Sequence, residues 1–151
     1  MPVLNAAAEA LIKAFEGLDL TAYRDSGGVL TIGYGHTGPD VYQGEVITAA
    51  QADDLFEHDA TRFCAGVNAV VARALTPNQF GALVSFAYNL GTNALASSTL
   101  LRLVNADAPL EQITEQFMRW VYGTDSSGNL IELPGLERRR AAEAKLYGTP
   151  E

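Results

Sequence analysis

The chain has 151 residues, of which 48% are hydrophobic and 19% charged. This composition excludes a disordered, collagen-like or low-complexity chain, and the length fits one domain that buries its own core. With 18 acidic and 10 basic residues, the net charge is −8. Such a charge argues against a nucleic-acid partner, because nucleic-acid binders carry a basic face. The single cysteine, Cys64, cannot form an internal disulfide, so nothing indicates a disulfide-built secreted scaffold.

Membrane and export signals are also missing from the sequence pattern. No run approaches the roughly 18 consecutive apolar residues of a membrane span. The first 15 residues carry Glu9 and Lys13 inside a helical pattern, rather than a basic segment followed by a clean apolar run. We therefore expect no signal peptide and no stable membrane association, and a product made in a cytoplasm.

The N-terminal third combines a helix with a glycine-rich segment. Apolar residues recur at helical spacing over residues 3–16, which predicts an amphipathic helix ended by Gly17. Strand-forming residues alternate with glycines between Leu20 and Glu45, which predicts a small antiparallel sheet. Its hairpin turn is expected at residues 25–28, where the sequence is Asp-Ser-Gly-Gly.

Helix-start signals recur along the rest of the chain, as capping side chains or as a proline at the first helical position. Together with the apolar periodicity, they predict five helices, over residues 48–71, 76–90, 98–105, 109–122 and 136–147. The fold class is therefore α+β and mainly helical. We expect one domain over residues 1–151, with a small sheet at 20–46 between helical parts at 1–16 and 48–147.

Glu16, Asp25 and Thr31 are the candidate catalytic residues of this sequence. Glu16 ends the first helix, where the helix dipole disfavours a negative charge, so a cation or a function should compensate. A hairpin folded back over this helix end would place all three side chains around one cleft. Glycoside hydrolysis needs two such carboxylates, one protonated toward the leaving oxygen and one ionised. The alternative also stands: Asp25 forms an Asx-turn and Glu16 simply pairs with an arginine.

Several runs of residues resemble the phage-type lysozymes, or endolysins, which are muramidases that cut bacterial peptidoglycan. The first are Phe15-Glu16-Gly17, Tyr23-Arg24-Asp25 and residues 30–37, and the likeness continues at residues 75–83, 86–91, 117–120 and 134–143. The resemblance thus covers nearly the whole chain in the family's order, and the spacing of Glu16, Asp25 and Thr31 matches the family's. It implies a lysozyme-like fold, in which a small sheet is followed by a helical bundle.

The resemblance implies a role for each residue of this triad. Glu16 would be the general acid that protonates the oxygen of the β-1,4 bond between N-acetylmuramic acid and N-acetylglucosamine. Asp25 would orient and activate the attacking water, and Thr31 would hydrogen-bond the same water. The outcome would resemble the inverting case of glycoside hydrolysis. No cofactor or metal is implied, and two distant histidines without a cysteine partner make no metal site.

Four other residues are expected to support the site. Tyr34, in the sheet that lines the cleft, is a candidate for saccharide contact. His36 is expected to pack near the catalytic turn rather than to shuttle a proton. By resemblance, either Arg139 or Arg140 would turn inward and supply the cation for Glu16. The other arginines of the 138–140 run are expected to be solvated.

Two other functions are compatible with parts of this pattern. A lytic transglycosylase needs the acid but no residue to orient water, so the presence of Asp25 and Thr31 argues against it. A catalytically silent glycan-binding module would be expected to lose Glu16 or Asp25. For a muramidase, the resemblance implies peptidoglycan strands as the partner and action on the cell wall after release from the host cytoplasm. It also implies dependence on a holin, and we expect a monomer.

Overall fold

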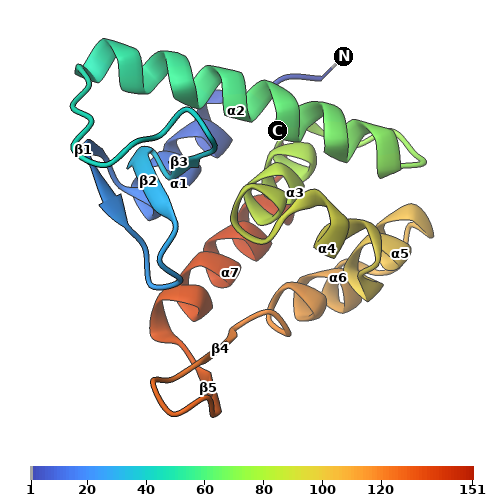
Figure 1. Ribbon diagram of the computed structural model, residues 1–151. Coiled ribbons are helices and arrows are strands. Elements are labelled where there is room, and N and C mark those ends of the chain that lie inside the picture. Colours follow the sequence, from blue (N-terminus) through green and yellow to red (C-terminus); the bar gives the residue numbers. More distant parts are fainter. Residues whose placement is uncertain (1) are drawn as a thin grey trace.

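The computed structural model describes residues 2–151. The chain starts with α1 (Ala6–Glu16) and continues into an antiparallel sheet of β1 (Asp19–Arg24), β2 (Leu30–Gly33) and β3 (His36–Thr37). The long helix α2 (Ala49–Val70) then leads from the sheet to the helical part, as Figure 1 shows. That part contains α3 (Pro77–Leu90), α4 (Thr92–Ala96), α5 (Thr99–Asn105), α6 (Leu110–Phe117), β4 (Tyr122–Thr124), β5 (Leu130–Glu132) and α7 (Pro134–Tyr147).

The α+β class and the capping signals are confirmed. Thr48 and Thr76 each form a capping box with the glutamine three residues later, at the starts of α2 and α3. Ser98 caps α5 as expected. The first helix, however, begins at Ala6 rather than at residue 3, because the Asn5 side chain accepts a hydrogen bond from the backbone of Ala8 and caps the helix there.

The prediction of one helix over residues 109–122 is wrong. Helix α6 ends at Phe117, and the next residues form tight turns with bonds three residues back, including Trp120 N to Phe117 O at 3.2 Å. The chain then makes a second hairpin, in which β4 pairs with β5. Its turn is closed by Asp125, whose Oδ1 accepts from the backbone of Ser127 and Asn129 at 2.9 Å each. The short helix α4 was also not predicted, and α7 begins two residues earlier than expected, at Pro134.

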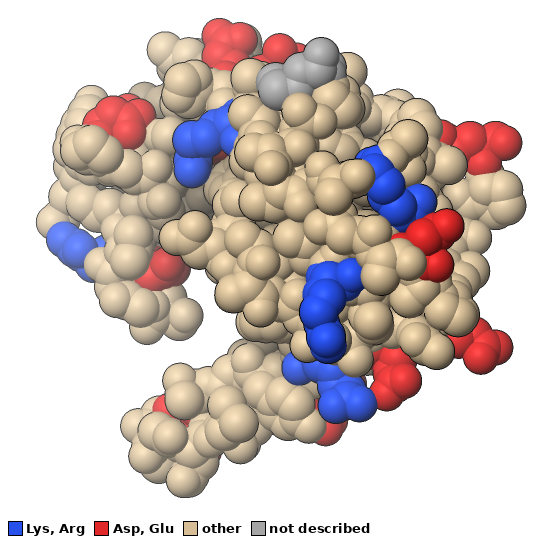
Figure 2. All heavy atoms as spheres, turned by 90° about the vertical axis from the view of Figure 1, so that its right-hand side faces the viewer, with Lys and Arg blue, Asp and Glu red and all other residues tan. Residues whose placement is uncertain are grey.

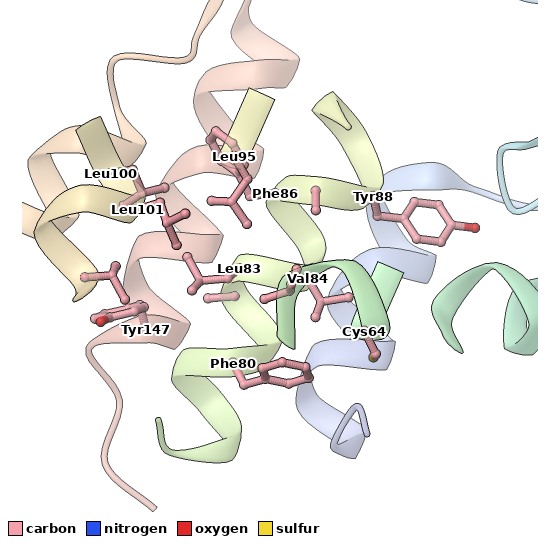
Figure 3. Close-up of a cluster of buried hydrophobic side chains, with 14 of the residues drawn as sticks. Cys64, Phe80, Leu83, Val84, Phe86, Tyr88, Leu95, Leu100, Leu101 and Tyr147 are labelled. Atoms are coloured by element: carbon pink, nitrogen blue, oxygen red, sulfur yellow. The ribbon is translucent and has the colours of Figure 1, made fainter. Parts of the chain in front are cut away.

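Helix α3 forms the centre of the helical part, because it is buried along most of its length. Side chains from α3, α4 and α5 pack together around Leu83, Phe86 and Leu100 (Figure 3). A second, smaller cluster lies under the sheet and contains Ile32 and Ala52. Because α2 contributes to both clusters, it fixes the sheet relative to the helices. Among residues 2–151, no helix is long and apolar enough to cross a membrane.

The approach of α1 to α3 sets where Glu16 ends up, and it depends on Gly81. A methyl group built on Gly81 would collide with the Cβ of Ala8. We expect Gly81→Ala to lower the free energy of unfolding by about 1–3 kcal/mol through overpacking, although alanine favours a helix over glycine by about 1 kcal/mol. Denaturant unfolding measures the change.

Gly135→Ala is the matched control, because its nearest heavy atom would be 3.9 Å away, an ordinary contact. It also lies within a helix, so it should leave stability unchanged or raise it. If Gly81→Ala proves as stable as Gly135→Ala, the close packing of α1 on α3 does not constrain the fold.

Candidate active site

Glu16 is the last residue of α1, and a single arginine holds its carboxylate. Gly17 ends the helix with a φ of 71°, and its N–H donates a hydrogen bond to Lys13 O. Arg139 Nη1 donates to Glu16 Oε2 at 2.5 Å, and the Glu16 side chain is 17% exposed. The compensating cation expected for this helix end is thus Arg139, not Arg140.

Of the other two arginines, Arg138 is exposed as expected, but the expectation that Arg140 is solvated is wrong. Arg140 is fully buried, with its Nε 2.8 Å from Glu143 Oε1 and its Nη2 donating to Asn89 Oδ1 at 2.8 Å. Burial lowers the pKa of Arg140, while the charge of Glu143 opposes that effect. Arg140 is inside because Glu143, three residues along the same helix, gives it an ionic partner.

The β1–β2 hairpin carries the other two residues of the triad. In the antiparallel register Tyr23 lies opposite Thr31, so both side chains share one face, and Asp25 follows Tyr23 by two residues. Asp25 Oδ1 accepts from the backbone of Gly27 at 2.9 Å and of Val29 at 2.8 Å. The expected Asx-turn is therefore present, and it also fixes the direction of the carboxylate.

Thr31 is buried, and its hydroxyl donates to Val29 O at 2.9 Å. Its neighbour Ile32 belongs to the apolar cluster under the sheet. Since successive side chains of a strand point to opposite faces, Thr31 faces away from that cluster. The hydroxyl keeps its lone pairs available as acceptors, because its hydrogen is already used.

Tyr23 carries a hydroxyl that feels the charge of both carboxylates, and the sequence pattern indicated only a strand at this position. Burial and the negative charges of Asp19, Glu16 and Asp25 together raise the pKa of the Tyr23 hydroxyl. That hydroxyl therefore lies within electrostatic range of both Glu16 and Asp25. Its position two residues before Asp25, on the same face of the strand, is a sequence signal that could have identified it.

Residues after β2 lie close to Glu16. A side chain on Gly35 would collide with Glu16 Oε1, and Gly35 has a φ of 73°, so both space and conformation call for glycine here. The Tyr34 carbonyl accepts a hydrogen bond from the Tyr88 hydroxyl at 2.6 Å. The ring of Tyr34 packs edge-on against Phe56 of α2, with the Lys13 ammonium 5.1 Å from its centroid.

His36 is buried between the sheet and α2. Its Nδ1 lies 2.7 Å from Asp59 Oδ2, and its Nε2 lies 2.9 Å from Asp40 Oδ2. Burial lowers the pKa of His36, but the hydrogen bonds and charges of the two aspartates outweigh burial and raise it above the ordinary value. These bonds go to Asp40 and Asp59 rather than to Asp25, so His36 ties β3 to α2.

A groove of about 560 Å³ opens beside Glu16. The ends of α1 and α3 and the start of α7 line it, with residues Ala14, Phe15, Glu16, Asn89, Leu133, Gly135, Leu136, Arg138 and Arg139. Figure 2 shows the surface deeply notched between the lowest part of the molecule, which is the β4–β5 hairpin in Figure 1, and the part above it. Glu16 thus lies at an open groove, whereas Asp25 and Thr31 are not among the residues that line it.

A small antiparallel sheet that follows the first helix, ahead of helices packed around a buried central helix, is the architecture of a lysozyme-like protein. A model of the phage lysozyme family matches residues 13–143. The endolysin of Bacillus phage PZA is 45% identical over 145 residues, 93% of this chain and 54% of that protein. The endolysin of Acyrthosiphon pisum secondary endosymbiont phage 1 is 38% identical over 91% of this chain and 92% of that protein.

Among solved structures, the muramidase domain of SpmX from Asticaccaulis excentricus superposes with a TM-score of 0.91 and is 37% identical. The match covers 99% of this chain and 100% of that one. The chain belongs to the phage lysozyme family. It spans about half the length of the endolysins of Bacillus phages PZA and B103.

The pair of His36 and Asp40 should make stability depend on pH. Because folding raises the pKa of His36, the pair contributes fully to stability below the pKa of histidine in the unfolded chain, about 6.5. This contribution is lost as the pH rises through the pKa of His36 in the folded protein. Hydrogen bonding to His36 lowers the pKa of Asp40, so its contribution is lost as the pH falls below about 4. We expect Asp40→Asn to destabilise the protein most between these limits, by up to about 1 kcal/mol because Asp40 is exposed.

Thermal unfolding of wild type and variant from pH 3 to pH 9 measures this difference. Asp54→Asn, an exposed change of the same charge on α2, is the control and should show no such window. If the stability difference between wild type and Asp40→Asn grows steadily from pH 6 to pH 9, the His36–Asp40 pair is not its source.

Proposed function

We propose that this chain hydrolyses the β-1,4 bond between N-acetylmuramic acid and N-acetylglucosamine in bacterial peptidoglycan. The observation that carries the proposal is the Glu16 carboxyl, which lines the groove and is held by Arg139, with Asp25 and Thr31 on one face of the neighbouring hairpin. The endolysin and muramidase names of its relatives support the same reaction.

In the proposed reaction, Glu16 enters protonated and gives its proton to the glycosidic oxygen as the bond from that oxygen to the muramic acid carbon breaks. The Glu16 side chain is mostly excluded from solvent, and its Oε2 is held by Arg139. The other oxygen, Oε1, is therefore the one that presents the proton. Glu16 Oε1 is the atom against which Gly35 packs, and a side chain at that position would displace the carboxyl.

Asp25 and Thr31 prepare the nucleophile on the other side of the bond. A water molecule gives one hydrogen to the ionised Asp25 carboxylate and directs the other to Thr31 Oγ1, so that its lone pair faces the sugar carbon. Both groups are suited to accept these hydrogens, since Asp25 is oriented through Oδ1 by two backbone N–H groups and the Thr31 hydroxyl already donates to Val29 O. The water supplies the new hydroxyl of the sugar, and its proton ends on Asp25.

The partners follow from this reaction. The substrate is a glycan strand of the cell wall, and the open groove beside Glu16 leaves room for a sugar of that strand. We place the protein in the host cytoplasm until a holin opens the membrane, and we expect it to act as a monomer. No cofactor takes part in the proposed steps.

Glu16→Gln should abolish hydrolysis, because an amide cannot donate the proton that the leaving oxygen requires. We expect at least a hundredfold loss of rate, the usual scale of general acid catalysis, with an unchanged circular dichroism spectrum. Release of reducing ends from purified peptidoglycan measures the rate, and mass spectrometry of the products detects any anhydro sugar.

The outcomes separate the candidate functions. Glu115→Gln, an exposed change of the same charge on α6, should retain full activity. More than a tenth of the wild-type rate in pure Glu16→Gln protein would contradict the role of Glu16 as the general acid. Anhydro products would indicate a lytic transglycosylase, and binding without any product from wild type would indicate a silent glycan-binding module.

The net charge of −8 should govern the encounter with an anionic wall. Figure 2 shows both acidic and basic side chains on the face that it presents. The Debye length falls from about 30 Å at 0.01 M salt to about 10 Å at 0.1 M, so added salt screens the repulsion. We expect the initial rate on purified sacculi to rise or stay constant over this range. A several-fold fall would mean that local positive potential in the cleft governs the encounter instead.

A further inference from the structure

Glu143 is a fully buried carboxylate on α7 that takes no part in the reaction steps above. Its Oε2 accepts from the Ser85 hydroxyl at 2.5 Å and from Arg139 Nε at 3.4 Å. Its Oε1 lies 2.8 Å from Arg140 Nε. Burial raises the pKa of Glu143, and the charge of Arg140 and the bond from Ser85 oppose that rise. A buried carboxylate is retained only with such partners, because leaving it unpaired is strongly destabilising.

Through Arg139, this carboxylate is connected to the catalytic acid. Arg139 donates through Nε to Glu143, through Nη2 to Ser85 O at 3.1 Å, and through Nη1 to Glu16. All three nitrogens of the guanidinium are therefore engaged, and its plane is fixed. Removal of the Glu143 contact would free one side of the group that holds Glu16.

The charges in this buried cluster also balance in a specific way. Arg139 and Arg140 bring two positive charges, and Glu143 cancels one of them, which leaves one positive charge beside Glu16. In the described chain, Glu16 and Glu143 are the two carboxylates that pair with Arg139. Without Glu143, a second uncompensated positive charge would favour the ionised form of Glu16, which cannot act as an acid.

We propose that Glu143 is a positioning residue for Glu16, which orients Arg139 and cancels one of the two buried arginine charges beside that carboxyl. This inference rests on the proposed function, in which Glu16 is the acid. It distinguishes Glu143 from a residue that only stabilises the core, because it predicts a change in how Glu16 titrates.

The other titratable and charged groups that face Glu16 and Glu143 come from three elements, and a test must account for each of them. On the β1 side, Glu16 is faced by Tyr23 and by the neighbours of Tyr23, Asp19 and Asp25. From the helices, it is faced by Tyr88 on α3 and by Arg139 and Arg140 on α7. Those around Glu143 are Ser85 on α3 and Arg139 and Arg140 on α7. Of these groups, the variants below change only Arg140 and Glu143.

The test follows the pH titration of the Glu16 carboxyl carbon by NMR, with the signal assigned by its loss in Glu16→Gln. Glu143→Gln removes one negative charge and should move the titration midpoint to lower pH by about one to two units, the size expected of a unit charge one side chain away at an effective dielectric constant near 20. The alkaline limb of the pH–kcat profile should move by the same amount, with KM unchanged.

Two further variants keep the proposal testable if Glu143→Gln does not fold. Arg140→Gln removes a positive charge, so the Glu16 midpoint should move to higher pH. The double variant Arg140→Gln/Glu143→Gln restores the balance, so the midpoint should return to that of wild type. Glu115→Gln changes the net charge by the same unit far from the cluster and should leave the midpoint in place.

The outcomes are distinct. A folded Glu143→Gln or Arg140→Gln protein whose Glu16 titration coincides with that of wild type overturns the inference. The NMR measurement needs no turnover, so a wild-type protein that releases no reducing ends would overturn the proposed function alone. Opposite shifts for the two single variants and recovery in the double variant would establish the role of Glu143.

Discussion

The contact between Arg139 and Glu16 is the interaction on which the site depends, and it joins residues 123 positions apart in the chain. It closes the fold by bringing the start of α7 against the end of α1. A buried arginine needs a fixed set of acceptors, because removal of its charge from water is expensive. The position of the Glu16 carboxylate is therefore inseparable from the packing of the C-terminal helix.

Helix α3 makes this contact possible, because α1 and α7 both pack on it. Small residues on its surface allow the approach: Gly81 faces Ala8 of α1, and Ser85 faces Glu143 of α7. The same residue, Ser85, offers a carbonyl to Arg139 and a hydroxyl to Glu143. A larger side chain at either position would separate the helices before the ion pair could form.

Local turn chemistry made much of the fold predictable, and the failures have physical causes. The Asp-Ser-Gly-Gly turn at residues 25–28 was recognised between strand-forming residues, but its counterpart at 125–128 was not, since it follows a helix-like run of apolar residues. The choice between Arg139 and Arg140 could not be made, because adjacent helical residues differ by about 100° and both directions were open. Glu143 stands at i+4 and i+3 from them, but that spacing is equally typical of exposed helix pairs such as Glu115 and Arg119, so it did not indicate burial.

Stability and catalysis make opposite demands on Glu16. An ionised Glu16 pairs with the positive charge of Arg139, whereas the proposed reaction needs Glu16 protonated. Sharing Arg139 among Glu143, the Ser85 carbonyl and Glu16 reduces this conflict, since the guanidinium keeps two acceptors when Glu16 becomes neutral. The arginine therefore does not rely on the charge of the acid to stay in place. An active-site acid can remain beside a cation and still carry a proton when the rest of the protein satisfies that cation.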